Sequence, residues 1–540
     1  MGNMINMKNI LKILCIVIIV GIFILPAQAV LQKQSVPSSS VTWLDNSFFQ
    51  VGQVNDFDPL VDEIIVTVTI NEIRILDKLF LFTDPDVFIK IFINGNEFVS
   101  EVWEKSMYVK EPNFSASLEV PKNDEYVDIA MELWAKNSRT GSLVICDISP
   151  ISGSSVEDNR VEMTYSIATG IWWGDDYLGD ASGYGRLNGC DDGSIYKNEF
   201  DAEVLFSISQ NDYDGDGLPY WLEVNVYNTS PYVDNTGEDA DNDGVPIEWE
   251  HRFGLTRHTQ NNQEGYLLIY NPNVWENHNT LDPDNDGLTN IEEYKTSQWG
   301  SDPFRKDIFL QINQMEIGPN GEGALVPELS FDMIRDSHAR QNVMWHIDDG
   351  RLGGGGLIPF KETLEDGDLS GWYWTYFMKG NSNNWRRGVF RWTIIAYDYT
   401  WAAGFAFSSR IGFLRALDCT FVSSKAMEER VSWFPLYNTF PIIGRNLRTF
   451  DVNMNWAYVF AGAIMHEVGH TLNIRTAGVD VPDSIWPWQE NYWKYKPYRS
   501  CMNYQYMYRG VIDYSDGSRG GTDHDDWGNL DFRYFLPRFW

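Results

Sequence analysis

The first half of the chain alternates apolar and polar residues over short stretches. Residues 64–70 read Ile-Ile-Val-Thr-Val-Thr-Ile, residues 87–93 read Val-Phe-Ile-Lys-Ile-Phe-Ile, and residues 127–134 read Val-Asp-Ile-Ala-Met-Glu-Leu-Trp. A period of two with β-branched residues is typical of strands, and Asn-Gly after the second stretch favours a tight hairpin turn. We therefore predict an N-terminal antiparallel β-sandwich over residues 56–208, preceded over 30–55 by a linker with no sustained pattern.

The pattern changes twice in the second half of the chain. Residues 209–303 are rich in Asp, Asn and Gly, which predicts a region of loops with little apolar core. From residue 304 to 540, strand-like runs such as 307–312 mix with helical ones, among them the apolar run 457–465. The C-terminal region is therefore expected to be an α+β domain.

A basic start and an apolar run mark the first 29 residues. Lys8 and Lys12 precede an uninterrupted apolar stretch over 13–25, and Ala27-Gln28-Ala29 supplies the small residues of a cleavage site. This stretch is short for a helix that crosses a bilayer, which needs about 20 residues. We predict a secretory signal peptide over 1–29, and hence a secreted or cell-surface protein; an uncleaved N-terminal anchor is the alternative.

The chain of 540 residues carries 41 Lys and Arg against 76 Asp and Glu, a formal net charge of −35. Such a charge repels phosphates and anionic lipid headgroups, which argues against nucleic-acid binding and against polybasic membrane binding. With 43% hydrophobic and 15% aromatic residues, the chain has enough apolar material for packed cores. Cations are therefore the expected partners of its acidic segments.

Four of the five cysteines would remain after signal cleavage, because only Cys15 lies in the first 29 residues. An even number in an oxidising compartment predicts one or two disulfides. Sequence order suggests the pairs Cys146–Cys190 and Cys419–Cys501, although four cysteines allow three pairings.

Three segments of the loop region repeat the spacing Asp-x-Asp-x-Asp-Gly with a Glu at the twelfth position. Three carboxylates at alternate positions converge if the chain wraps a hard cation, the glycine permits the sharp turn, and the distal Glu can supply two oxygens. The predicted calcium ligands are Asp212, Asp214, Asp216 and Glu223 in the first segment, Asp239, Asp241, Asp243 and Glu250 in the second, and Asp282, Asp284, Asp286 and Glu293 in the third.

These segments resemble the EF-hand-like calcium loops of dockerins and thrombospondin type-three repeats, because no amphipathic helix is predicted before them. The resemblance implies about three Ca²⁺ ions with a structural rather than a catalytic role. Three dications would offset half of the twelve loop charges and would stiffen a region with little apolar core.

The apolar helical run of the C-terminal region leads into His466-Glu467-Val468-Gly469-His470. Two histidines four residues apart lie one turn above each other on a helix, so both imidazoles can bind one Zn²⁺ while Glu467 serves as the catalytic base. This is the spacing of zincins. The expected fold class is therefore multidomain, with an N-terminal antiparallel β-sandwich, a calcium-loop linker region and a C-terminal α+β zincin catalytic domain.

The residues after this helix resemble those of metzincin zinc proteases, in which a glycine ends the helix and a methionine turn follows. Asn473 stands at the glycine position and can take the same left-handed conformation. Ser500-Cys501-Met502-Asn503-Tyr504 is similar to the methionine turn. The resemblance implies that Met502 underlies the metal and that Tyr504 faces it and assists the oxyanion.

The third zinc ligand is where the chain departs from metzincins, because Thr476 occupies the position of the third histidine. We favour Asp480, which follows the turn after Gly478 and offers a carboxylate oxygen suited to zinc. Glu490 is the main alternative, since thermolysin-type gluzincins place their glutamate ligand at this distance from the second histidine. The full set of candidates is Asp480, Asp483, Glu490 and His524.

Within the predicted sandwich, residues 76–90 and 132–134 resemble the calcium- and phospholipid-binding sandwich of synaptotagmin and protein kinase C. The acidic loop that follows the last strand in those proteins is replaced here by Ala135-Lys136-Asn137. Calcium is therefore not expected at this loop.

Together these features predict a secreted zinc-dependent endopeptidase that hydrolyses a protein or peptide substrate with metal-activated water. The expected cofactors are one catalytic Zn²⁺ and about three structural Ca²⁺. Neither nucleic acid nor a membrane span that remains after signal cleavage is expected. The alternative is a calcium-dependent surface adhesin or binding protein whose protease domain is inactive because Thr476 replaces a metal ligand.

Overall fold

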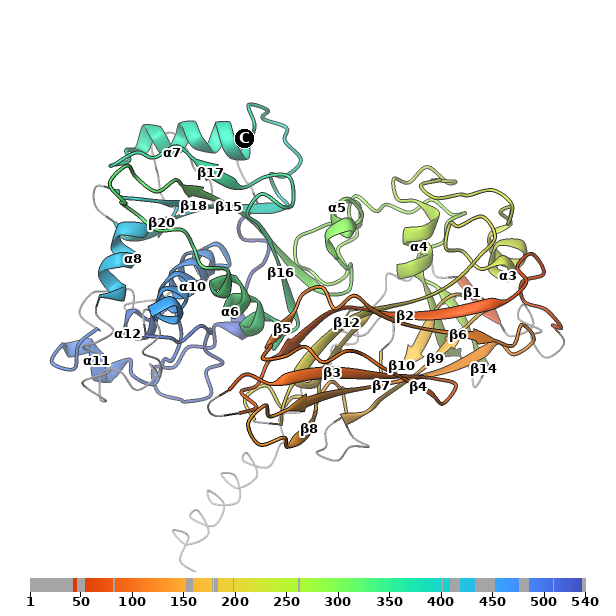
Figure 1. The fold of residues 1–540 in the computed structure, drawn as a ribbon. Coiled ribbons are helices and arrows are strands. Elements are labelled where there is room, and N and C mark those ends of the chain that lie inside the picture. The colour runs from red at the N-terminus through yellow and green to blue at the C-terminus, as the bar shows by residue number, and fades with distance from the viewer. Residues whose placement is uncertain are drawn as a thin grey trace, which may run out of the picture. The chain divides into compact units, whose positions relative to one another are not determined.

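Two antiparallel sheets occupy residues 64–210 (Figure 1). The first has the order β10-β9-β7-β3-β4 with β8 paired to β7, and the second has the order β11-β12-β2-β5 with β6 paired to β2. The strands of the first sheet are β3 (Asp86–Ile93), β4 (Asn96–Val99), β7 (Tyr126–Lys136), β8 (Leu143–Cys146), β9 (Val161–Ser166) and β10 (Trp172–Gly174). Those of the second are β2 (Ile64–Ile75), β5 (Tyr108–Val109), β6 (Phe114–Val120), β11 (Arg186–Asn188) and β12 (Ala202–Gln210).

The computed structural model describes residues 42–45, 54–80, 83–151, 159–176, 178, 183–197, 199–260, 263–399, 402–407, 418–432, 452–474, 485–507 and 509–536. All of them belong to the unit Ser40–Trp540. The predicted signal peptide over 1–29 lies outside the described residues.

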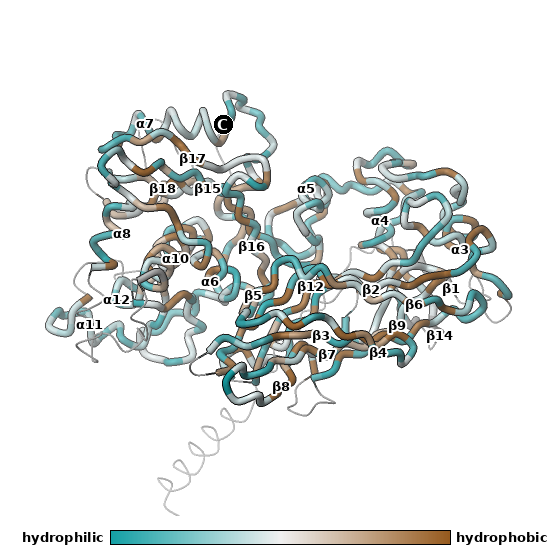
Figure 2. Tube along the Cα trace, in the orientation of Figure 1, coloured by the Kyte–Doolittle hydropathy of each residue, from teal (hydrophilic) through white to brown (hydrophobic). Residues whose placement is uncertain are grey.

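Alternation along the strands builds one buried core between the two sheets. In β3 every second residue, from Val87 to Ile93, is fully buried and contributes to the same hydrophobic cluster as β2 and β12. Asn94 and Gly95 take left-handed conformations with φ of 46° and 76°, which closes the β3–β4 hairpin with Ile93 opposite Asn96. Figure 2 shows hydrophobic positions along β2 and β3. The antiparallel sheets predicted for 56–208 are thus confirmed.

A strand also occurs inside the predicted linker. β1 (Thr42–Asp45) pairs antiparallel with β14 (Gln263–Leu268), which in turn pairs with β13 (Leu255–Gln260). The strand is held by backbone pairing with one edge of the distant β13–β14 hairpin. Four residues are too few to show a periodic pattern, so the sequence gives no sign of it.

Short helices follow the Asp-rich loops of residues 209–303. They are α3 (Tyr220–Leu222), which continues into the π-helix η3 (Glu223–Tyr227), α4 (Ile247–Gly254), and α5 (Asn290–Thr296), which continues into the 3-10 helix η4 (Ser297–Trp299). The glutamate at the twelfth position of each repeat therefore lies on a helix, where its side chain is held in place beside its loop. The expectation of little apolar core is wrong, because Leu218, Trp249 and Tyr270 are buried in the same hydrophobic cluster as the strands of the two sheets.

The third main sheet lies in the C-terminal region and is mostly parallel. Its order is β16-β15-β18-β20-β19, with β17 also paired to β15. All pairings are parallel except the last, because the edge strand β19 runs antiparallel to β20. The strands are β15 (Lys306–Met315), β16 (Val343–Asp348), β17 (Gly356–Ile358), β18 (Phe390–Ala396), β19 (Gly404–Ala406) and β20 (Cys419–Ser423).

Helices cover both faces of this sheet, as a parallel sheet requires. Along β15, Ile308 and Leu310 pack in a cluster with residues of helices α6 and α10, while Phe309 points to the opposite face and packs with residues of α7. The helices and helical turns are α6 (Glu328–Ala339), α7 (Asp366–Trp372), the π-helix η5 (Tyr373–Phe377), α8 (Ser424–Val431), α10 (Val452–Thr471), α11 (Glu490–Lys494), α12 (Tyr504–Met507) and the 3-10 helix η7 (Trp527–Asn529). The region mixes strands and helices as expected, but the predicted α+β arrangement is wrong in detail, because parallel strands with helices on both faces form an α/β arrangement.

The predicted disulfides are not formed in this structure. Cys146, Cys190, Cys419 and Cys501 are all free and buried. Cys146 and Cys190 belong to different hydrophobic clusters, and so do Cys419 and Cys501. Pairing by sequence order is wrong because neighbours along the chain pack into separate cores.

Candidate active site and cation-binding loops

Helix α10 carries the two histidines and is buried on nearly all sides. Val459, Phe460 and Ile464 are fully buried. The helix packs against α6 and α8 and against strands β19 and β20, which explains why its sequence is apolar all round. Nowhere in the described parts of the chain is there a helix long and apolar enough to cross a membrane.

Helix α10 ends in a Schellman motif at Asn473. The φ of Asn473 is 64°, the N–H of Ile474 donates to the carbonyl of Gly469 at 3.1 Å, and the N–H of Asn473 donates to the carbonyl of His470 at 3.3 Å. The expectation that Asn473 takes the left-handed conformation is confirmed. This turn also places the carbonyl oxygen of Ile474 3.4 Å from Nδ1 of His470.

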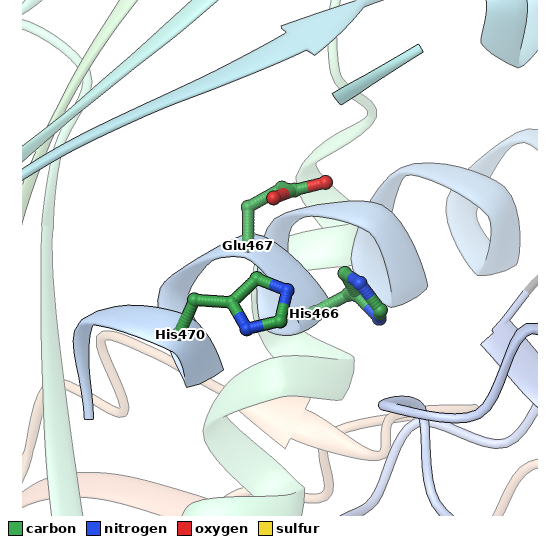
Figure 3. Close-up of side chains that lie close together, drawn as sticks. All are labelled: His466, Glu467 and His470. Carbon is green, nitrogen blue, oxygen red and sulfur yellow. The ribbon is translucent and has the colours of Figure 1, made fainter. Parts of the chain in front are cut away.

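The two histidines lie one turn apart on the same side of α10 (Figure 3). Their ring centroids are 4.9 Å apart and the rings are nearly perpendicular, at 88°. Nδ1 of His466 lies 3.0 Å from the carbonyl oxygen of Cys501. Since a carbonyl can only accept, each Nδ1 carries the proton, and Nε2 is the ring nitrogen that can bind a metal.

Glu467 lies between the histidines and is almost fully buried. One ligand atom of Glu467 and one of each histidine lie within 4.8 Å of one another. The carboxylate reaches Gly404 at the start of strand β19, where a Cβ would overlap Oε1 of Glu467. The absence of a side chain at Gly404 therefore leaves the space that the carboxylate occupies.

The segment Ser500–Asn503 forms a turn beneath this part of α10. The N–H of Cys501 donates to the carbonyl of Asp513 at 2.8 Å, and the carbonyl of Cys501 holds His466. Met502 is fully buried, and its sulfur lies 2.5 Å from where a Cβ of Gly469 would be. The ring of Tyr504, which begins α12, is 5.4 Å from the ring of His466. Met502 and Tyr504 thus lie beside the histidines.

The candidates for a third ligand fall into two groups. Asp480 and Asp483, together with Thr476, lie outside the described residues. Glu490 is an exposed residue at the start of α11, and His524 is an exposed residue whose ring packs against Tyr498. The group formed by His466, Glu467 and His470 contains neither of them. The two imidazoles, one helical turn apart, are donors that fit zinc, and the adjacent carboxylate of Glu467 lies where a base could act on a metal-bound water.

The Asp-rich loops bring their carboxylates together. Asp212, Asp214 and Asp216 offer oxygens within 4.8 Å of one another, and so do the three aspartates of the second loop. The N–H of Gly217 donates to Oδ2 of Asp212 at 3.0 Å, and Gly217 has a φ of 83°. The glycine thus permits the sharp turn that folds each loop back on its first aspartate, as predicted.

The second loop includes residues outside its repeat. Asp243, Glu250 and His278 are buried with ligand atoms within 4.8 Å of one another, and Nε2 of His278 lies 3.1 Å from Oδ2 of Asp243 and 3.6 Å from Oε2 of Glu276. Burial, followed by the charges of Asp243 and Asp241, raises the pKa of Glu250 to about 10. A cation beside the Glu250 carboxylate would favour its ionised form.

The third loop joins the C-terminal sheet through Asp307, the second residue of β15. Oδ2 of Asp286 accepts the N–H of Asp307 at 2.7 Å, and Oδ1 of Asp307 lies 2.6 Å from Nε2 of His346 on β16. Burial, followed by the charges of Asp286 and Asp307, raises the pKa of Glu293 well above its usual range. The loop and the sheet therefore share one buried group of carboxylates.

Sequence reasoning assigned no role at these sites to Glu276, His278, Asp307 or Gly404. Glu276 and His278 follow the second repeat by more than 20 residues, and Asp307 follows the third repeat at the start of an apolar strand. A signal did exist at Asp307, because a charged residue near the start of an apolar strand that is expected to be buried needs a partner. Gly404 carries no such signal.

Comparisons with known proteins give no family. No family model matches the chain, and no curated protein matches it. Among solved structures, human GIVD cytosolic phospholipase A2 in complex with methyl gamma-linolenyl fluorophosphonate is 12% identical, with a TM-score of 0.18; the match covers 29% of this chain and 18% of the phospholipase. A C2 domain of plant Extended Synaptotagmin 1 is 13% identical, with a TM-score of 0.17 over 28% of this chain and 96% of that domain. Likenesses this weak carry no conclusion about fold or activity.

Proposed function

We propose that the chain is a secreted zinc-dependent endopeptidase of the metzincin type, stabilised by structural calcium. The observation that carries the proposal is the pair His466 and His470, whose Nδ1 atoms face backbone carbonyls, with the buried Glu467 between them. Metal-binding histidines commonly donate their second ring nitrogen in this way, which fixes the tautomer and the ring orientation. The buried Met502 beneath the helix supports the comparison with metzincins.

Zinc would be held by Nε2 of His466 and Nε2 of His470, with Asp480 as the proposed third ligand. When bound, the ion would polarise a peptide carbonyl as a Lewis acid and acidify the attacking water. The calcium loops would hold about three Ca²⁺ ions, because their ligands are carboxylates and oxygen is the ligand that this ion prefers.

Glu467 is the proposed general base and acid. Its carboxylate takes a proton from water as the new C–O bond forms, and then gives that proton to the amine nitrogen as the peptide C–N bond breaks. Gly404 leaves the space in which the carboxylate can lie. The hydroxyl of Tyr504 donates a hydrogen bond to the carbonyl oxygen as negative charge develops on it.

Strand β19 supplies a place for the substrate backbone. One edge of β19 pairs with β20, and no strand in the described parts of the chain pairs with its other edge. An extended peptide can add to such an edge through backbone hydrogen bonds. Because Gly404 at the start of β19 lies against Glu467, a peptide bound there would run past the proposed base.

The test is the Glu467→Gln variant of the full chain. Loss of the base should lower hydrolysis of a generic protein substrate by roughly 10²–10⁴-fold, while about one zinc per chain remains bound, because Glu467 is not a proposed ligand. Glu429→Gln, at an exposed position of α8, is the matched control and should keep full activity. Full activity in Glu467→Gln would refute the role of the base. A wild-type chain that binds calcium but neither binds zinc nor cleaves protein would instead support the adhesin alternative.

A further inference from the structure

A separate group of carboxylates lies beside the sandwich, outside the Asp-x-Asp-x-Asp-Gly repeats. Asp147 follows strand β8, Asp192 ends the 3-10 helix η2 (Gly189–Asp192), and Glu199 precedes strand β12. One oxygen of each lies within 4.8 Å of the other two. Asp147 is 0% exposed, and the other two are half-buried.

The backbone holds these three segments together. The N–H of Asp147 donates to the carbonyl of Phe200 at 3.0 Å, and the N–H of Ala202 donates to the carbonyl of Asp147 at 2.8 Å. Gly189 packs so closely that a Cβ there would lie 2.5 Å from the carbonyl oxygen of Asp147. The position of the carboxylates is therefore set by backbone contacts between β8, η2 and β12.

Each acid keeps one oxygen without a partner. Oδ1 of Asp147 accepts the N–H of Ser149 at 3.0 Å, and Oδ1 of Asp192 accepts the N–H of Ser194 at 2.7 Å. Oδ2 of Asp147, Oδ2 of Asp192 and Oε2 of Glu199 are buried, and none of the described residues hydrogen-bonds to them. A carboxylate oxygen that is buried without a donor is costly, so these three atoms need a ligand.

Other carboxylates lie close to Asp147. No Lys, Arg or His of the described residues forms an ion pair with Asp147, Asp192 or Glu199. The carboxylates of Asp201, Asp192 and Glu199 lie close enough to repel the charge of Asp147. A proton would remove only part of this repulsion, whereas a dication would satisfy all three free oxygens at once.

We propose that Asp147, Asp192 and Glu199 bind a fourth structural cation, a hard divalent ion that takes oxygen ligands, which we assign as Ca²⁺. The donor set contains only oxygen, and its arrangement from three separate segments suits the flexible coordination of Ca²⁺ better than the strict octahedron of Mg²⁺. This site goes beyond the proposed protease function and does not depend on it.

An ion at this site would brace the contact between η2 and helix α6. Just before η2, Arg186 and Asn188 donate to the carbonyl of Ala339, the last residue of α6, at 2.9 and 3.2 Å. Cys190 of η2 packs with Leu76 and Ala339 in a small hydrophobic cluster. Helix α6 in turn packs against α10. The ion would therefore stabilise the segment on which α6 rests.

The test is the number of Ca²⁺ ions bound per full-length chain, measured by calorimetric titration with calcium chloride and by elemental analysis after dialysis. Asp147→Asn and Glu199→Gln should each bind one Ca²⁺ fewer than the wild type. Asp191→Asn is the matched control, because this neighbouring residue pairs with Arg186 instead, and it should bind as many as the wild type.

Two results would overturn the proposal. The first is an unchanged calcium count in Glu199→Gln, a half-buried position at which the variant is expected to fold even if Asp147→Asn does not. The second is a site that Mg²⁺ fills in competition with equimolar Ca²⁺. The ions of the three loops can be distinguished from the ion at Asp147. Asp282→Asn should remove the ion of the third loop and leave the ion at Asp147 in place. This result does not depend on the protease activity of either variant.

Discussion

A single methyl group at Gly404 should displace the proposed base without unfolding the protein. Gly404 begins strand β19, and its φ lies outside the left-handed region, so alanine fits the backbone. A Cβ there would lie 3.1 Å from Cδ of Glu467 and 3.3 Å from Cγ, and it would overlap Oε1. The atoms in the way form the end of a flexible side chain, which can move.

The expected size of the effect follows from this overlap. Ordinary contact between the methyl group and the carboxylate requires the oxygen to move by roughly 1 Å, and a misplacement of that size in a catalytic group costs on the order of 10²-fold in rate. This corresponds to about 2.7 kcal/mol of transition-state stabilisation. Thermal stability should not fall, because glycine to alanine at a compatible position stabilises by about 0.4–1 kcal/mol through the unfolded state.

The assay compares Gly404→Ala with two other glycine variants by kcat for a fluorogenic peptide, zinc content and Tm. Gly371→Ala on α7 meets open space and should change neither activity nor zinc. Gly462→Ala on α10 would strike the backbone carbonyl of Met507, which cannot rotate away, so it should lower Tm. Wild-type kcat in Gly404→Ala, or a fall in rate matched by a fall in zinc, would refute the role given to Glu467.

Three further predictions concern the metal sites. In calcium-free buffer, the free energy of unfolding should fall as pH rises from about 4.5 to about 10, because the folded pKa of Glu250 is raised to about 10 from a usual 4.5 and its ionisation opposes folding. Calcium should flatten this dependence of Tm on pH in a series of melting curves. Equal pH dependence with and without calcium would count against an ion at Glu250. Asp307→Asn should reduce the rise in Tm that calcium produces, whereas Asp349→Asn, a half-buried aspartate after β16, should leave that rise intact. Asp480→Ala should lower zinc content and activity with calcium content unchanged, and loss of zinc in Glu490→Ala instead would transfer the ligand role to Glu490.

Local chemistry explains what could be predicted from the sequence. The alternation of β3, the Asn-Gly turn and the left-handed Asn473 depend on residues within a few positions of one another, and each follows from elementary backbone preferences. The carboxylate loops are similar, because one segment of about twelve residues carries its own ligands. Such features can be read before any tertiary contact is known.

The remaining features depend on contacts between distant residues. Asp307 joins the third loop, and Gly404 leaves room for Glu467, only because the fold brings them there. The cysteine pairs failed for the same reason, since sequence order does not reveal which core a side chain enters. Strand β1 was missed because its partner, β14, lies more than 200 residues further along the chain.

The junction between Asp286 and Asp307 bears on the order in which the C-terminal sheet folds. Strand β15 is the first strand of that sheet along the chain and pairs with β16, β17 and β18. Its pairing with β18 closes a long stretch of chain, which is slow, whereas Asp286 and Asp307 are only 21 residues apart. An ion bound at this junction would fix the start of β15 early, at a small entropic cost. Calcium should therefore quicken refolding as well as slow unfolding, so that the sheet assembles fastest where calcium is plentiful.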